Sequence, residues 1–352
     1  MPIRTITAAL RAPRMALLMM VSVALTGCAT NPLHSVTGMV MTDYAEKENT
    51  PYVLEMHDIE MACSLGESVD PLLYSFSRVT AAPETTGTLL SILSGICMEQ
   101  VAVEEELRYL RADYRGDSTE TRDARAGMQR KFGITAERRV EAFERVKRAY
   151  DYDPSPDDHE CPTLSTDQDE ITFLLGLAAG AQAVLDDAKA RGWAGVSRSL
   201  APQVERSAAC LDNEKWAGLP DAIRASVWVL LPDTKPSDDI DPWGVMEANR
   251  ELAHEGGIRT AVAIELMMAE NVDRQDVIAD ALHFLAENQR DFTPSEPYRL
   301  VDRVGMRMAW ATSDRFWTRE HGHRTPNNRF GRTGTELDER EEREEIDTEG
   351  LL

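Results

Sequence analysis

One pair of side chains has a spacing suited to metal chemistry. Glu251 and His254 are three residues apart, which places a carboxylate and an imidazole on one face of a helix, as in di-iron helical bundles. Such a site needs a second Glu-x-x-His pair and two more inward glutamates, and the nearest match is Asp280 with His283. Glu251 and His254 are therefore weak candidates for a metal-dependent enzyme, and a solvated helix face is the simpler interpretation.

Tryptophans and arginines supply a second set of candidates. Four of the six tryptophans gather in one part of the chain, and two arginines near them lie on expected apolar helices: Trp193, Trp216, Trp228, Trp243, Arg224 and Arg259. Aromatic rings that converge between helices can line a ligand pocket, and the arginines could meet an acidic ligand there. The alternative is that the rings fill the core and the joints between helices.

Catalytic signatures are missing from the sequence. It holds no nucleophile elbow of the G-x-S-x-G kind, no dinucleotide-binding G-x-G-x-x-G and no P-loop. We therefore expect no enzyme activity and no cofactor, apart from the weak metal hypothesis.

Cys28 follows a segment typical of export. Residues 1–14 carry three arginines and no acid, and residues 15–25 are apolar or small, which is the pattern of a secretory signal. The run is too short to span a bilayer, which needs about 20 residues. It ends in Leu-Thr-Gly-Cys, which resembles a bacterial lipobox, so we predict cleavage after Gly27 and lipidation of Cys28, with acyl chains such as palmitate. The alternative is an ordinary secretory signal with a chance cysteine.

Four cysteines remain once Cys28 is set aside: Cys63, Cys97, Cys161 and Cys210. An even number in an oxidising compartment favours two disulfides. Three pairings are possible, and the sequential one, Cys63 with Cys97 and Cys161 with Cys210, would join neighbouring helices. Buried free thiols are the alternative. No paired Cys/His spacing supports a zinc site.

Charge excludes one class of function. Residues 1–27 hold three of the 38 basic residues and none of the 61 acidic ones, so the rest of the chain has a net charge of −26. A nucleic-acid-binding protein needs clustered basic surface, so we expect no such role.

Composition and periodicity predict an all-α protein. Aromatic residues are only 6% of the chain, and apolar residues recur at i, i+3 and i+4. We expect stacked antiparallel helix pairs, as in tetratricopeptide-like solenoids, although no repeat consensus appears. The predicted helices cover residues 52–76 with a new helix at Asp70-Pro71, 85–114, 118–148 as two antiparallel helices with a kink at Gly133, 169–191, 197–211, 219–231, 242–255, 258–270, 273–288 and 296–316.

Domain organisation follows from the same pattern. We predict a signal peptide at 1–27, a lipidated cysteine and tether at 28–50 with a short helix near 36–44, and a helical domain at 51–320. A loop rich in Asp and Pro at 150–169 marks a possible boundary between two halves. Residues 325–352 are expected to form an acidic disordered tail, because nine acids and two arginines lie between 336 and 349.

The combination resembles the T-component (TatT-like) lipoproteins of TRAP-type solute transporters. The resemblance rests on the lipobox at Cys28, the helix pairs at 52–114 and the run 223–270, with Asp-Pro-Trp at 241–243 and Glu-Gly-Gly-Ile-Arg at 255–259. It covers about residues 50–290, and the charged segment 118–148 and the acidic tail depart from it. It implies a helical, lipid-anchored periplasmic protein that oligomerises and meets a substrate-binding protein.

Two main hypotheses follow. The first is a membrane-anchored periplasmic scaffold that binds a partner protein or a small ligand. Such a scaffold could serve as an accessory to solute transport. The second is a structural envelope lipoprotein without a ligand. Residue 29 is Ala rather than Asp, and by resemblance to enterobacterial lipoproteins this favours the outer membrane, facing the periplasm, over the inner membrane.

Overall fold

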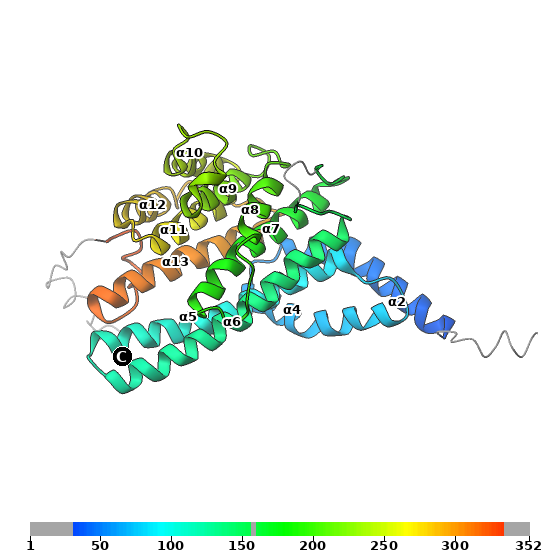
Figure 1. The fold of residues 1–352 in the computed structure, drawn as a ribbon, viewed down its shortest axis with the longest axis horizontal. Coiled ribbons are helices and arrows are strands. Elements are labelled where there is room, and N and C mark those ends of the chain that lie inside the picture. The colour runs from blue at the N-terminus through cyan, green and yellow to red at the C-terminus, as the bar shows by residue number, and fades with distance from the viewer. Residues whose placement is uncertain (1–30, 156–159, 334–352) are drawn as a thin grey trace, which may run out of the picture.

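The computed structural model describes residues 31–155 and 160–333, and all regular structure in these ranges is helical (Figure 1). The predicted all-α class is therefore confirmed. The α-helices are α2 (Pro32–Tyr44), α3 (Thr50–Leu54), α4 (Ile59–Tyr74), α5 (Glu84–Tyr114), α6 (Ser118–Ala149), α7 (Asp167–Lys189), α8 (Leu200–Ala208), α9 (Leu219–Leu230), α10 (Pro242–Glu255), α11 (Thr260–Asn271), α12 (Gln275–Glu287) and α13 (Arg299–His321). A π-helical turn (Ala45–Asn49) and short 3₁₀ turns (Ser75–Arg78 and Pro232–Thr234) complete them.

The fold is organised on α5, α6 and α7. α5 and α6 form a long antiparallel hairpin, and α7 packs on both of them. The turn between α5 and α6 is closed by Gly116 at a φ of 69°, and the Asp117 carboxylate then accepts hydrogen bonds from the first backbone amides of α6. This glycine and cap explain why the chain reverses direction there.

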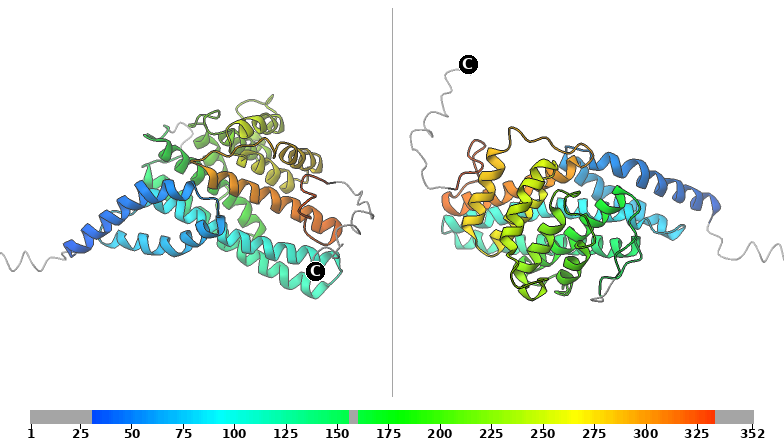
Figure 2. Two further views of the ribbon diagram at one scale, coloured as in Figure 1. Left: turned by 180° about the vertical axis from the view of Figure 1, so that it is seen from behind. Right: turned by 90° about the horizontal axis from the view of Figure 1, so that it is seen from above.

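The last long helix ties distant parts of the chain together. α13 packs against α11 and against α5, and it also contacts α3 and α4 (Figures 1 and 2). In a linear solenoid each repeat contacts only its neighbours. The repeat arrangement expected from the sequence is therefore not confirmed.

One apolar core crosses the loop between α6 and α7. Its buried members include Phe143 of α6, Leu174 of α7 and Ile264 of α11. Residues 150–155 and 160–166 connect helices that share this core, and smaller apolar clusters lie on each side of the loop.

The predicted break at Pro71 is absent. α4 runs through Pro71, which lies in the last turn of the helix and removes a single backbone hydrogen bond there. Asp58 caps this helix instead, its Oδ1 accepting from the Met61 amide at 2.9 Å. Asp70, expected as a cap, forms an ion pair with Arg145 of α6. A tertiary ion pair thus replaces the predicted local cap.

The predicted break in 118–148 is also wrong. α6 is a single helix of 32 residues. Gly133 does not kink it: the Trp193 ring lies against this glycine, and a Cβ there would come within 2.7 Å of Trp193 Cδ1. The glycine provides space for a neighbouring ring. α6 also packs along α5, rather than projecting alone.

Residues 31–50, expected as a tether, are helical almost throughout. α2 begins at an Asn31 cap and Pro32, a favourable start for a helix, and it continues through the π-helical turn into α3. Asn31 Oδ1 accepts from the Leu33 amide at 3.0 Å. Only a short helix near 36–44 is expected from the sequence, because the segment is polar and short on periodicity, and the observed helix begins earlier, at Pro32.

Two cysteine pairs lie at disulfide distance. Cys63 of α4 and Cys97 of α5 have Cα atoms 5.3 Å apart, and Cys161 and Cys210 have Cα atoms 5.6 Å apart. These are the sequential pairs. The second one fixes the loop before α7 to the end of α8.

Several predictions concern residues outside the described ranges. The signal peptide at 1–27, Cys28 and residues 334–352 of the acidic tail fall there. Within the described ranges, α5 and α7 are long and apolar enough to span a membrane by length and composition, and most of each apolar window is buried inside the protein. This burial is typical of core helices.

Candidate ligand-binding cavity

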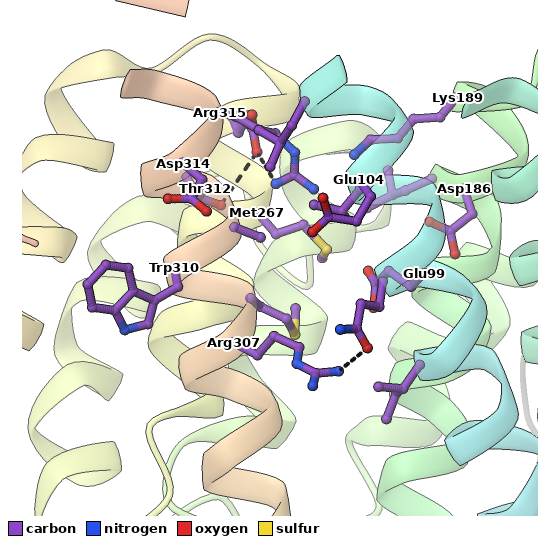
Figure 3. A pocket seen from close by; sticks show the side chains of 18 of the residues that line it. Glu99, Glu104, Asp186, Lys189, Met267, Arg307, Trp310, Thr312, Asp314 and Arg315 are labelled. Atoms are coloured by element: carbon purple, nitrogen blue, oxygen red, sulfur yellow. Dashed lines mark hydrogen bonds and ion pairs between the residues drawn. The ribbon is translucent and has the colours of Figure 1, made fainter. Parts of the chain in front are cut away.

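A cavity of about 180 Å³ lies where α5, α7, α11 and α13 meet. Its wall combines apolar and charged side chains from all four helices (Figure 3). The apolar part is formed by Ile96, Val103, Leu107, Leu185, Met267, Val304, Met308 and Ala311. A mixed lining of this kind is typical of sites for small molecules that have an apolar body and a few polar groups.

Arg315 of α13 holds one end of the cavity. Its Nε donates to Glu106 Oε2 at 2.7 Å, and one of its terminal nitrogens donates to Glu270 Oε2 at 3.0 Å. Arg319 donates to the other oxygen of Glu270, also at 3.0 Å. Burial alone would raise the pKa of Glu106, but Arg315, Lys189 and Arg319 outweigh it and lower this pKa to about 2. The carboxylate is therefore ionised and fixed.

A second buried cluster lies on the α6 and α7 side. The Arg139 guanidinium is buried, pairs with Asp186 and donates to Glu99 Oε2 at 2.6 Å. One cation thus serves two carboxylates. Burial, together with the nearby Glu99 charge, outweighs Arg139 and raises the pKa of Asp186 to about 6. Asp186 therefore takes up a proton more readily than an ordinary aspartate does.

Of the cationic side chains of the cavity wall, Lys189 lies farthest from its nearest described carboxylate partner. It extends from α7 toward Arg315 (Figure 3), and its ammonium lies 3.8 Å from Glu106 Oε2 and 4.7 Å from the centre of the Phe132 ring. No hydrogen bond from this ammonium to another described residue is found. A partly exposed ammonium has three donors, so Lys189 retains donors for a bound molecule.

The acidic side chains of the wall are mostly engaged by arginine. Glu104 pairs with Arg324, and Asp314 lies 3.9 Å from the same guanidinium. The segment after α13 contributes Arg324 and also covers Trp310, whose ring centre is 4.4 Å from that of Phe330. Arg307 pairs with Glu60 of α4 and thereby links the rim of the cavity to the first helices.

The four tryptophans singled out in the sequence have packing roles and do not line this cavity. Trp216 is buried, donates from Nε1 to Glu170 at 2.7 Å and meets the Tyr298 ring edge-on at 5.3 Å. Trp228 and Trp243 belong to a small apolar cluster with Met246.

The other candidate side chains for a ligand pocket, Trp193, Arg224 and Arg259, also contact neighbouring residues. Trp193 is exposed beside Gly133. Arg224 donates to Glu205 and Asp221, and Arg259 forms a two-pronged pair with Asp302. Neither arginine faces the cavity between α5 and α13. The density of tryptophans in the sequence suggested a pocket among them, whereas Trp216 and Trp228 donate their indole N–H groups to Glu170 and Glu205.

Within the part of the chain that the structure describes, Glu251 and His254 join no cluster of metal-binding side chains. Glu251 is exposed, and the His254 ring packs against Phe292 at 5.8 Å and Phe284 at 6.5 Å. Among the described residues, no group of three or more His, Cys, Asp or Glu side chains is arranged to hold a metal ion. Glu251 therefore faces solvent, whereas His254 packs on aromatic rings.

Sequence reasoning missed the cavity because its walls are far apart in the chain. Arg315 and Glu106 are separated by 209 residues. The available signal was the i, i+4 spacing of arginines on α13, at 303, 307, 315 and 319, beside apolar positions. That pattern does not say which helix supplies the carboxylates.

No protein family, curated protein or solved structure matches this chain.

Proposed function

We propose that this protein is a lipid-anchored periplasmic protein that binds a small anionic molecule in the cavity between α5, α7, α11 and α13. The observation that carries the proposal is Lys189, a cation with spare donors in a wall whose carboxylates are already paired. A carboxylate head on the ligand would meet Lys189, and an apolar body would lie on Met267, Met308 and the neighbouring aliphatic side chains.

The sign of the ligand charge follows from the pairing. Glu99 and Asp186 share Arg139, and Glu270 is held by Arg315 and Arg319. A cationic ligand would have to compete with these guanidinium groups. An anionic ligand would meet Lys189, whose Glu106 partner lies at 3.8 Å and which donates no hydrogen bond to another described residue. The asymmetry favours an anion.

The anchor and the partner belong to the same proposal. Lipidation at Cys28 would hold the helical body at the outer membrane, and a periplasmic substrate-binding protein would receive or deliver the ligand, as the resemblance to TRAP T-components implies. Recovery of such a protein from periplasm with the soluble body as bait, and palmitate incorporation that is lost in Cys28→Ser, test these parts.

Thermal shift with small carboxylates tests the cavity. Monocarboxylates with short apolar chains should raise the melting temperature of the soluble body, and the matching alcohols should not. Lys189→Met should abolish the shift. Lys215→Met is the matched control, because Lys215 pairs with Asp167 and Glu170 away from the cavity. Equal shifts for acids and alcohols, or an unchanged response in Lys189→Met, would contradict the proposal.

A further inference from the structure

α2 carries an apolar stripe that faces away from the protein. Leu33, Val36, Val40 and Tyr44 are spaced by three, four and four residues, so they share one helix face. They are 68%, 52%, 62% and 59% exposed. The beginning of α2 also extends past the other helices (Figures 1 and 2).

The opposite face of α2 is the one that packs on the body. Gly38 is buried, and a Cβ placed on it would overlap the Thr80 side chain and lie 3.4 Å from Phe76 Cβ. Ser35 and Thr42 lie on the same side and line a groove with residues 79–85. The orientation of the stripe is therefore fixed by packing, and the apolar side chains on it are left to the surroundings.

An apolar helix face is stable only when it is covered. Removal of large apolar side chains from water is favourable. The stripe holds four such side chains, and exposure of all of them to water is unfavourable.

Chain continuity identifies the cover. Leu33 is five residues after Cys28, and five residues span at most about 18 Å even when fully extended. If Cys28 carries acyl chains, Leu33, the first residue of the stripe, cannot lie farther than that from the headgroups. No Lys or Arg lies between positions 28 and 46, and Asp43 and Glu46 are acidic. The contact would therefore depend on apolar insertion rather than on anionic lipid.

We propose that α2 docks along the stripe Leu33–Val36–Val40–Tyr44 in the interface of the phospholipid bilayer to which Cys28 is attached. This inference rests on the lipid anchor of the proposed function. The helix would lie in the plane of the membrane surface and fix the orientation of the whole body, because α2 packs on α4 and on its own π-helical continuation.

An environment-sensitive fluorophore at position 40 tests the docking. The acylated full protein carrying Val40→Cys with the dye is mixed with phosphatidylcholine vesicles that contain a lipid-phase quencher. We expect a blue-shifted emission and strong quenching. Arg125→Cys, on the exposed surface of α6, is the matched control and should keep the emission of water.

The outcomes separate the anchor from the docking. If the protein floats with vesicles while the dye at position 40 stays unquenched, the anchor holds and the docking is wrong. If the protein does not float, the anchor fails, and the docking inference fails with it. If the dye is shielded without lipid quenching and the protein runs as a dimer, a second copy covers the stripe and the membrane inference is overturned.

A second variant checks that the stripe itself carries the affinity. In unacylated Cys28→Ser protein, changing Leu33, Val36 and Val40 together to Ser should lower vesicle partitioning roughly tenfold or more, since three apolar side chains no longer insert. Circular dichroism confirms that the helices remain. Unchanged partitioning would contradict the inference.

Discussion

At the scale of single residues, the protein is defined by arginines buried beside pairs of carboxylates. Arg139 holds Glu99 and Asp186, and Arg315 holds Glu106 and Glu270. A buried ion pair costs much desolvation, but removal of one partner leaves an uncompensated charge. These clusters therefore fix the geometry of the cavity wall more than they add net stability.

Replacement of Arg139 by Met should destabilise the protein strongly. Asp186 and Glu99 would lose their counter-ion in a buried site, at a cost of about 3–5 kcal/mol in the free energy of unfolding. Urea denaturation measures this. Arg108→Met is the control, because the Arg108 pairs with Glu105, Glu120 and Asp123 lie at the surface, and its effect should be far smaller. Similar losses in both variants would argue against the role of burial.

Asp186 should make stability depend on pH. Its pKa rises from 3.8 to about 6 in the folded protein, so the folded state binds this proton more tightly than the unfolded state. The resulting stabilisation is complete below about pH 3.8 and is lost as the pH rises through 6. The Asp186→Asn variant cannot lose stability in this way, because its amide does not titrate. The ion pair between Arg139 and Glu99 remains in the variant.

Urea titrations of both proteins between pH 4 and 7 measure the difference. The stability of Asp186→Asn relative to wild type should rise across this window, by roughly 3 kcal/mol at most. A relative stability that falls or stays flat over the window would mean that Arg139 controls the titration of Asp186 instead.

At the scale of helices, close approach sets the architecture. Gly176 of α7 lies against α6, where a Cβ would overlap the Val146 side chain. Local signals predicted α5, α7 and α9 to α12 within a few residues, because apolar periodicity marks their extent. They failed at Pro71 and Gly133, where the deciding contacts, Asp70 with Arg145 and Gly133 with Trp193, come from distant parts of the chain.

Gly176→Ala should destabilise the protein although alanine favours helix. The gain of about 1 kcal/mol in helix propensity is outweighed by overpacking between α6 and α7, which typically costs 1–3 kcal/mol. Gly95→Ala in α5 is the matched control, since its new Cβ would lie an ordinary 3.4 Å from Arg139 Cγ. The control should be neutral or slightly stabilising. Stabilisation of both variants would show that α6 and α7 are less tightly packed.

At the scale of the whole molecule, the return of α13 onto α5 creates the cavity. No local pattern relates residues about 200 positions apart. The helices could therefore be predicted from the sequence, but the packing of α13 against α5 could not. The cysteine pairs are the exception, since simple order in the chain was enough to favour the pairing that the structure has.

Loss of the second cysteine pair should loosen the middle of the molecule. Cys161→Ser with Cys210→Ser removes a link across 49 residues, and on the chain-entropy model this costs about 4 kcal/mol. Non-reducing peptide mapping of the wild type should first show the linked peptides. If the double variant and the wild type had the same melting temperature, the Cys161–Cys210 disulfide would not stabilise the fold.

The most direct test of the central claim is native mass spectrometry of the protein purified gently from its own cell envelope. We predict a small molecule bound in one copy per chain, released on unfolding and detected as an anion, and absent from Lys189→Met while retained by Lys215→Met. A wild-type protein without a bound molecule, even after incubation with small carboxylates, or a molecule retained equally by Lys189→Met, would contradict the assignment of the cavity.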